Sequence, residues 1–168
     1  MGWLDQLFGT RSDAATDALY AAVIDRARAP HWYLEGRVPD TIDGRFDMVA
    51  SILSFVLLRL ERDAEAAGAS ARLTEAFVTD MDGQLREIGV GDVIVGKQVG
   101  NMMGMLGGRL GAYRDAVAAG NIDAVVERNI FRGEAPAGAV SHVSAHLNTF
   151  GHALADTPTA AILVGQLP

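Results

Sequence analysis

The feature that most constrains this chain is a stretch near residue 50 where apolar residues cover almost the whole circumference of a predicted helix. Thr41 or Asp43 begins this helix, which continues to about Ala67. Its apolar positions are Phe46, Met48, Val49, Ile52, Leu53, Phe55, Val56, Leu57 and Leu60. A helix of this kind must be covered by several neighbours. We therefore expect it at the centre of a helical bundle.

The rest of the sequence repeats the helical periodicity, interrupted by Gly and Pro. The other predicted helices span about 12–29, 70–88, 92–119, 121–131, 140–154 and 160–167. We expect Ser12 or Asp13 to cap the first of them, Gly68 to end the central helix and Asp92 to cap the helix after Gly89–Gly91. The segment 30–40, with two prolines and two aromatic residues, reads as an ordered loop held against the core.

These elements predict an all-α fold, a single compact bundle of six to seven helices. We place the helical domain at residues 12–168, after a short amphipathic N-terminal segment at residues 1–11. This segment lacks the features of a secretory signal. The longest apolar stretch, Met48–Leu58, is too short to span a bilayer. We expect a cytoplasmic protein whose Trp3, Leu4, Leu7 and Phe8 can contact the inner membrane peripherally.

Composition excludes several classes of function. The 168 residues include no cysteine, so disulfides and thiolate chemistry are ruled out. The net charge is −7 and no basic patch stands out, so we expect no nucleic-acid binding. No nucleophile or pair of carboxylates has a convincing context. We therefore predict no catalytic residues and no cofactor.

Residues 91–97 match the first seven positions of a phosphate-binding P-loop. The eighth position must be Ser or Thr to hold magnesium, and here it is Gln98. The P-loop also follows a strand, whereas a helix precedes this segment. We therefore interpret it as a glycine-rich turn between helices.

A stripe of small residues runs along the helix at 92–119. Its members are spaced by four: Gly96, Gly100, Gly104, Gly108 and Ala112. Each interior glycine costs a helix about 1 kcal/mol relative to alanine, so a close contact should compensate. Small residues at this spacing let another helix approach closely. We favour an internal helix contact, for Gly104 in particular; the alternative is a groove for an apolar client segment, flanked by Met102, Met103 and Met105.

His142 and His146 are four residues apart and share one face of a predicted helix. This spacing permits metal or haem ligation, but no acidic third ligand is evident. We therefore predict no metal site and interpret them as partly exposed helical residues. Haem binding at these histidines remains the alternative function.

Charged residues gather beside two of the apolar helices and at the start of a third. They are Asp40, Asp43, Arg45, Asp47, Asp80, Asp82, Arg86, Glu87, Asp92 and Lys97. One interpretation is helix capping and surface ion pairs, each worth less than about 1 kcal/mol. The other is a polar rim around a binding groove.

Two blocks of this sequence resemble the ubiquinol–cytochrome c chaperone family. The first is Val38–Asp47; the second comprises Asp80–Asp82, Leu85–Asp92 and Val95–Lys97. Tyr113 and Arg128–Phe131 also resemble it, and the similarity covers Leu19 to about Leu154.

The resemblance implies an all-helical, non-enzymatic assembly factor for respiratory complex III. Mitochondrial relatives escort newly made cytochrome b into the complex with a second assembly factor. This chain lacks their long targeting extension, which suits a bacterial cytoplasm, and its Lys97 helix is richer in glycine. We expect it to shield newly made cytochrome b, or another apolar membrane-protein segment, without ATP. The predicted partner-binding residues are Asp40, Arg45, Asp47, Asp80, Asp82, Arg86, Asp92, Lys97, Gly100, Gly104 and Gly108.

Overall fold

The computed structural model describes the backbone of residues 3–87, 89 and 91–168, with side chains except those of 3–12, 85, 92–95 and 99. These residues are all-helical, without strands. In chain order the helices are α1 (Trp3–Ala27), α2 (Pro30–Tyr33), α3 (Ile42–Leu60), a 3-10 turn (Ala64–Ala66), α4 (Ala67–Glu87), α5 (Asp92–Ala119), α6 (Asp123–Ile130), α7 (Ala139–Asp156) and α8 (Thr159–Leu163). Because α2 and α8 are single short turns, the described part agrees with the predicted bundle of six to seven helices.

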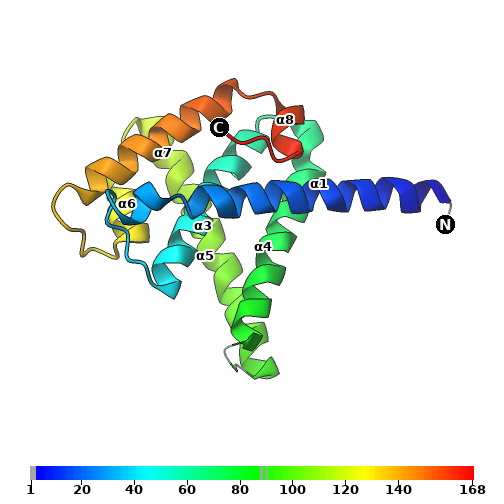
Figure 1. The fold of residues 1–168 in the computed structure, drawn as a ribbon, viewed down its shortest axis with the longest axis horizontal. Coiled ribbons are helices and arrows are strands. Elements are labelled where there is room, and N and C mark those ends of the chain that lie inside the picture. Colours follow the sequence, from blue (N-terminus) through cyan, green and yellow to red (C-terminus); the bar gives the residue numbers. More distant parts are fainter. Residues whose placement is uncertain (1–2, 88, 90) are drawn as a thin grey trace.

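The central position predicted for the apolar helix is confirmed. Every residue of α3 from Asp47 to Leu57 is buried, and α1, α4, α5, α6 and α7 all contact it (Figure 1). The Thr41 hydroxyl caps its first turn by accepting from the Gly44 N–H at 3.1 Å. The Ser51 and Ser54 hydroxyls donate to carbonyls one turn earlier, so these buried polar groups are satisfied within the helix.

The central helix is shorter than predicted. It ends at Leu60, and Gly68 lies inside α4 instead of ending α3. The cause is Asp63, which has extended backbone angles and accepts from the Glu65 N–H at 3.1 Å. An aspartate side chain that binds its own backbone competes with helix continuation. Ala64–Ala66 therefore form a separate 3-10 turn, and Ala67 begins α4.

The predicted starts of two helices are also wrong. The first helix begins at Trp3, so Ser12 and Asp13 lie inside α1 and do not cap it. In α5, Gly91 occupies the cap position with extended backbone angles, and Asp92 is the first helical residue. Gly89, after α4, has the left-handed backbone typical of a residue that ends a helix, with φ of 83°, while Val90 lies outside the described residues. A domain boundary at residue 11 stays a prediction.

The loop at 30–40 is held against the core, as predicted. Trp32 of α2 is fully buried, and its indole N–H donates to the Arg26 carbonyl at 2.9 Å. Gly44 approaches this loop so closely that a Cβ there would lie 1.9 Å from the Pro39 carbonyl oxygen. The loop and the first turn of α3 therefore form one packed unit.

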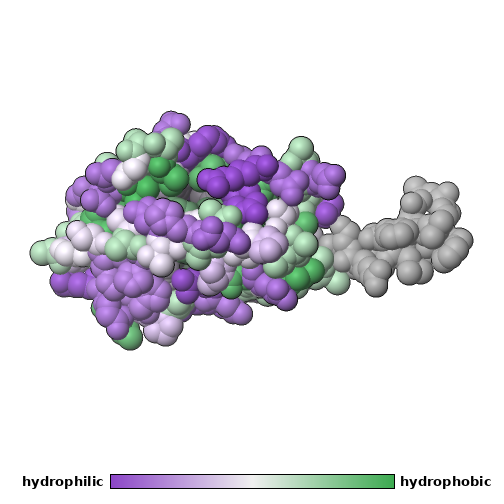
Figure 2. Space-filling view, turned by 90° about the horizontal axis from the view of Figure 1, so that it is seen from above, coloured by the Kyte–Doolittle hydropathy of each residue, from purple (hydrophilic) through white to green (hydrophobic). Residues whose placement is uncertain are grey.

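The helices are arranged with α4 and α5 side by side as a long pair that extends away from α7 and α8 (Figure 1). The face seen from above, in Figure 2, is a mixture of hydrophilic residues and small apolar patches. Among the described residues, no helix is both long and apolar enough to cross a membrane.

Candidate functional site

A pocket of about 430 Å³ opens between the start of α3, the end of α4 and the middle of α5. Its lining combines apolar and charged side chains: Ile42, Asp43, Phe46, Met81, Gln84, Glu87, Gln98, Met102, Met105, Arg109 and Arg132. The four residues from α5 lie at spacings of four, three and four, which places them on one face of that helix. Pockets of this volume typically hold small molecules or a few anchoring side chains.

The apolar part of the pocket has a rigid base and an exposed edge. Phe46 packs against Phe77 with ring centroids 5.8 Å apart, and Met81 is buried. Met105 is 46% exposed and Ile42 is 73% exposed, so apolar surface reaches solvent at the mouth. Methionine has a flexible, polarizable side chain that adapts to irregular partners. This arrangement suits an apolar ligand of variable shape.

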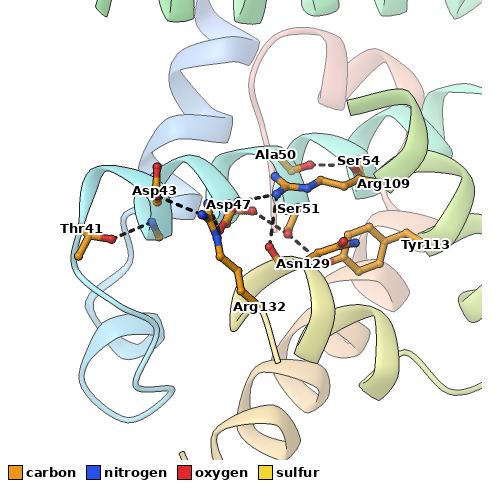
Figure 3. Close-up of polar contacts among 11 residues, drawn as sticks. Thr41, Asp43, Asp47, Ala50, Ser51, Ser54, Arg109, Tyr113, Asn129 and Arg132 are labelled. Carbon is orange, nitrogen blue, oxygen red and sulfur yellow. Dashed lines mark hydrogen bonds and ion pairs between the residues drawn. The ribbon is translucent and has the colours of Figure 1, made fainter. Parts of the chain in front are cut away.

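The charged part of the pocket is organised by Asp47 (Figure 3). Its side chain is 1% exposed and accepts from Arg109 at 2.5 Å and from Arg132 at 3.2 Å. Arg132 also bonds Asp43, one turn earlier on α3, at 3.1 Å. Burial raises the pKa of Asp47, while the two guanidinium groups act in the opposite direction. Asp47 therefore fixes both arginines at the rim of the pocket.

Arg109 retains an unused donor at this rim. Its guanidinium lies over the Phe46 ring, with Cζ 5.2 Å from the ring centroid. One nitrogen bonds Asp47, and the same nitrogen donates to the Asn129 carbonyl at 3.4 Å. The other terminal nitrogen, Nη1, is buried and has no hydrogen-bond partner in the described part of the chain. A buried donor without a partner costs free energy, and it belongs to a residue that lines the pocket.

Tyr113 lies behind the charged cluster and is fully buried. Its hydroxyl is 2.9 Å from the Ser51 hydroxyl, which in turn donates to the Asp47 carbonyl. Burial raises the pKa of Tyr113 to about 12, so it is neutral at physiological pH. Phe131, from the block at Arg128–Phe131, is also buried. These residues support the pocket rather than line it.

The other predicted partner-binding charges are scattered. Asp40 and Arg45 form an exposed pair at 2.7 Å that does not line the pocket. The Asp80 carboxylate accepts from the Tyr20 hydroxyl at 2.7 Å and so joins α4 to α1. Asp82 and Arg86 pair along α4 at 2.9 Å, Lys97 is exposed on α5, and the Asp92 side chain is outside the described part. These charges do not form one continuous rim.

The structure around the glycine stripe differs from the internal helix contact that the sequence predicts. A Cβ at Gly96, Gly100, Gly104 or Gly108 would meet no atom within 4 Å, so the internal helix contact favoured for Gly104 is wrong. Gly100 and Gly104 each follow a pocket-lining residue, Gln98 or Met102, by two positions. Two residues correspond to about 200° of rotation around a helix. Gly100 therefore faces away from the pocket, while Gly104 and Gly108, which directly precede Met105 and Arg109, lie about 100° from those residues around the helix.

Sequence reasoning missed several pocket residues, including Arg109, Arg132 and Phe46. A signal for the α5 face was present, since Gln98, Met102, Met105 and Arg109 share helical spacing. Arg132 directly follows the block at Arg128–Phe131, but its distance from Asp47 in the sequence hid their contact. Pairing across this distance requires the fold.

Comparison with known proteins shows to which family this chain belongs. The family described as "Ubiquinol-cytochrome C chaperone" matches residues 34–167, which is most of the chain. The chain belongs to the ubiquinol–cytochrome c chaperone family. Its structure also resembles the crystal structure of the Cbp3 homolog from Brucella abortus, with a TM-score of 0.83 and 27% sequence identity. That match covers 98% of this chain and 94% of the other, while no curated protein matches.

The family match and the pocket coincide. Ile42, Asp43 and Phe46 come from the block at Val38–Asp47, and Met81 and Glu87 come from the second block. The two blocks that carried the resemblance are thus brought together on one concave surface. Family membership confirms the suspected relationship and the chaperone class, which is generally non-enzymatic.

Proposed function

We propose that this chain is a non-enzymatic assembly chaperone for respiratory complex III that shields an apolar segment of newly made cytochrome b without ATP. The observation that carries the proposal is the methionine-lined pocket, because both family-like blocks contribute to it. A newly made membrane segment exposes apolar surface that aggregates in water. An exposed methionine edge over a rigid aromatic base can cover part of such a segment.

The pocket is too small for a whole helix, so the proposed contact is made by anchoring side chains. An amphipathic or apolar helix that binds a groove uses residues spaced by three or four as anchors. Those anchors would contact Met81, Met102 and Met105, while Ile42 extends the apolar mouth. The Arg109 guanidinium, which lines the pocket, would donate to a polar atom of the client. Polar contacts of this kind fix the register of an otherwise apolar ligand.

Two further proposals follow from the family, and a third concerns the surface of this chain. A second assembly factor cooperates with this chain, and the work takes place at the cytoplasmic face of the inner membrane. The charged residues outside the pocket, together with Gly100, Gly104 and Gly108, provide surfaces for these additional contacts. Because the net charge is −7, anionic lipid headgroups repel the chain. We therefore propose that its contact with the membrane is made by apolar side chains.

The test compares two methionines of α5 with similar exposure. Met105 lines the pocket and is 46% exposed, whereas Met103 is 42% exposed and does not line it. We expect Met105→Glu to reduce co-purification of cytochrome b with the full chain at least tenfold, because a charge would be buried against the client. Met103→Glu should retain most of it.

The readouts are cytochrome b recovered from native membranes and the cellular level of complex III. Both variants should keep the wild-type melting temperature, since both side chains are exposed. Equal losses in the two variants, or no loss in Met105→Glu, would contradict the assignment of the client to this pocket.

A further inference from the structure

Three histidines from two distant parts of the chain meet on the side of α7 that faces α2. His142 and His146 lie one turn apart on α7, and His31 belongs to α2. The ring centroids of His31 and His146 are 4.7 Å apart, and those of His142 and His146 are 4.2 Å apart. One potential ligand nitrogen from each ring lies within 4.8 Å of the others. Sequence analysis identified only the α7 pair and predicted no metal site.

The hydrogen bonds around the cluster leave lone pairs available. His146 Nδ1 is 2.9 Å from the His142 carbonyl oxygen. Because a carbonyl oxygen only accepts, Nδ1 of the neutral ring carries the proton and Nε2 carries the lone pair. A metal-binding histidine is commonly oriented by this kind of bond to a backbone carbonyl. His31 Nδ1 and His142 Nε2 are buried and have no hydrogen-bond partner among the described groups.

The local packing brings the rings together. Trp32 anchors α2 in the core, beside His31. Gly36 makes room for the third ring, because a Cβ there would lie 3.1 Å from Cδ2 of His142.

We propose that His31, His142 and His146 bind one divalent transition-metal ion of the Zn²⁺ class. Three imidazoles suit Zn²⁺, Co²⁺, Ni²⁺ or Cu²⁺ better than the hard ions Ca²⁺ or Mg²⁺. Zn–N bonds of about 2.0–2.1 Å place the nitrogens of a tetrahedral site about 3.3–3.4 Å apart, so each donor has to move inward by about 1 Å or less. His146 is exposed, which leaves a fourth position open to solvent. The ion fastens α2 to α7.

The geometry favours a bare ion over haem. In haem the porphyrin supplies four ligands to iron, and the protein supplies one or two axial ones. Three imidazoles converging on one point therefore exceed what haem uses on one side. None of the three histidines lines the methionine-lined pocket, so this site is independent of the proposed chaperone function.

The experiment uses the full chain without a polyhistidine tag, titrated with ZnCl2 against a chromophoric chelator. The wild type should bind one equivalent of Zn²⁺, and its melting temperature should rise on binding. His31→Ala, His142→Ala and His146→Ala should each weaken binding at least tenfold. His152→Ala is the matched control, because His152 is the remaining histidine of the chain, is exposed on α7, and lies outside the cluster. It should bind as the wild type does.

CoCl2 provides a second readout. A Co²⁺ ion held by three imidazoles and water should give the intense visible absorption typical of four-coordinate cobalt, and His146→Gln should abolish it. His146 is exposed, so this variant should keep the wild-type circular dichroism spectrum. Wild-type affinity for Zn²⁺ no higher than that of His146→Gln would overturn the proposal. So would a haem Soret shift that His142→Ala abolishes in a protein that does not bind Zn²⁺.

Discussion

At the scale of single residues, Asp47 holds the charged side of the pocket together, because it is the buried counter-charge shared by Arg109 and Arg132. From the sequence alone, its place in the block at Val38–Asp47 predicts a position at a polar rim or in a partner contact. The structure buries it between Arg109 and Arg132. Both partners are more than 60 positions later in the chain. Local sequence patterns do not identify ion pairs of this range.

Loss of the Asp47 carboxylate should destabilise the fold strongly. Asp47→Ala leaves Arg109, whose side chain is only 11% exposed, without its counter-charge. Removal of one partner from a buried pair typically costs about 3–5 kcal/mol. Urea denaturation followed by circular dichroism measures this loss.

Asp40 offers a matched control from the same block. It pairs with Arg45 at the surface, where both side chains are more than half exposed. Asp40→Ala should therefore leave the denaturation midpoint nearly unchanged. If Asp47→Ala were as stable as Asp40→Ala, the buried pair would not organise the pocket rim.

At the scale of elements, α3 and α5 differ in how far their sequences determine their environment. The apolar circumference of α3 correctly predicted a buried central helix, because almost every face must leave water. The small residues of α5 indicated a face suited to close approach, but spacing alone does not say whether a neighbour is present. The structure shows none within 4 Å of the glycine stripe. Met102 and Met105 lie on another face of α5 and meet residues of α3 and α4 at the pocket.

The same substitution should have opposite effects in these two helices. Gly104→Ala meets open space, so it should stabilise α5 by up to about 1 kcal/mol through helix propensity. Gly44→Ala would place a Cβ 1.9 Å from the Pro39 carbonyl oxygen, and we expect a loss of about 1–3 kcal/mol. Thermal denaturation of the two variants provides the comparison. A destabilised Gly104→Ala would mean that something covers the stripe.

A partner role for Gly100, Gly104 and Gly108 stays a prediction. Gly104→Leu should fold with nearly the wild-type stability, because nothing in the described structure opposes the larger side chain. If the stripe binds a partner helix, the same variant should also lose complex III assembly. Full assembly in a stable Gly104→Leu would remove the stripe from the list of interfaces.

At the scale of the whole molecule, the sequence predicted the helical class and the family, while the fold was needed to place the site. The two family-like blocks, separated in sequence, converge on the start of α3 and the end of α4. Another long-range contact brings His31 of α2 to His142 and His146 of α7. In each case one half of the site was visible in a local pattern. The other half depended on how the helices pack.

The central claim is that newly made cytochrome b contacts the methionine-lined pocket. The most direct measurement is photo-crosslinking in cells with a photoreactive amino acid at position 105, compared with position 164. Val164 is 55% exposed but does not line the pocket. We predict a crosslink to cytochrome b from position 105 that is lost when Met102→Glu is added, and none from position 164. A crosslink from position 164 alone, or one from position 105 that Met102→Glu leaves intact, would contradict the account.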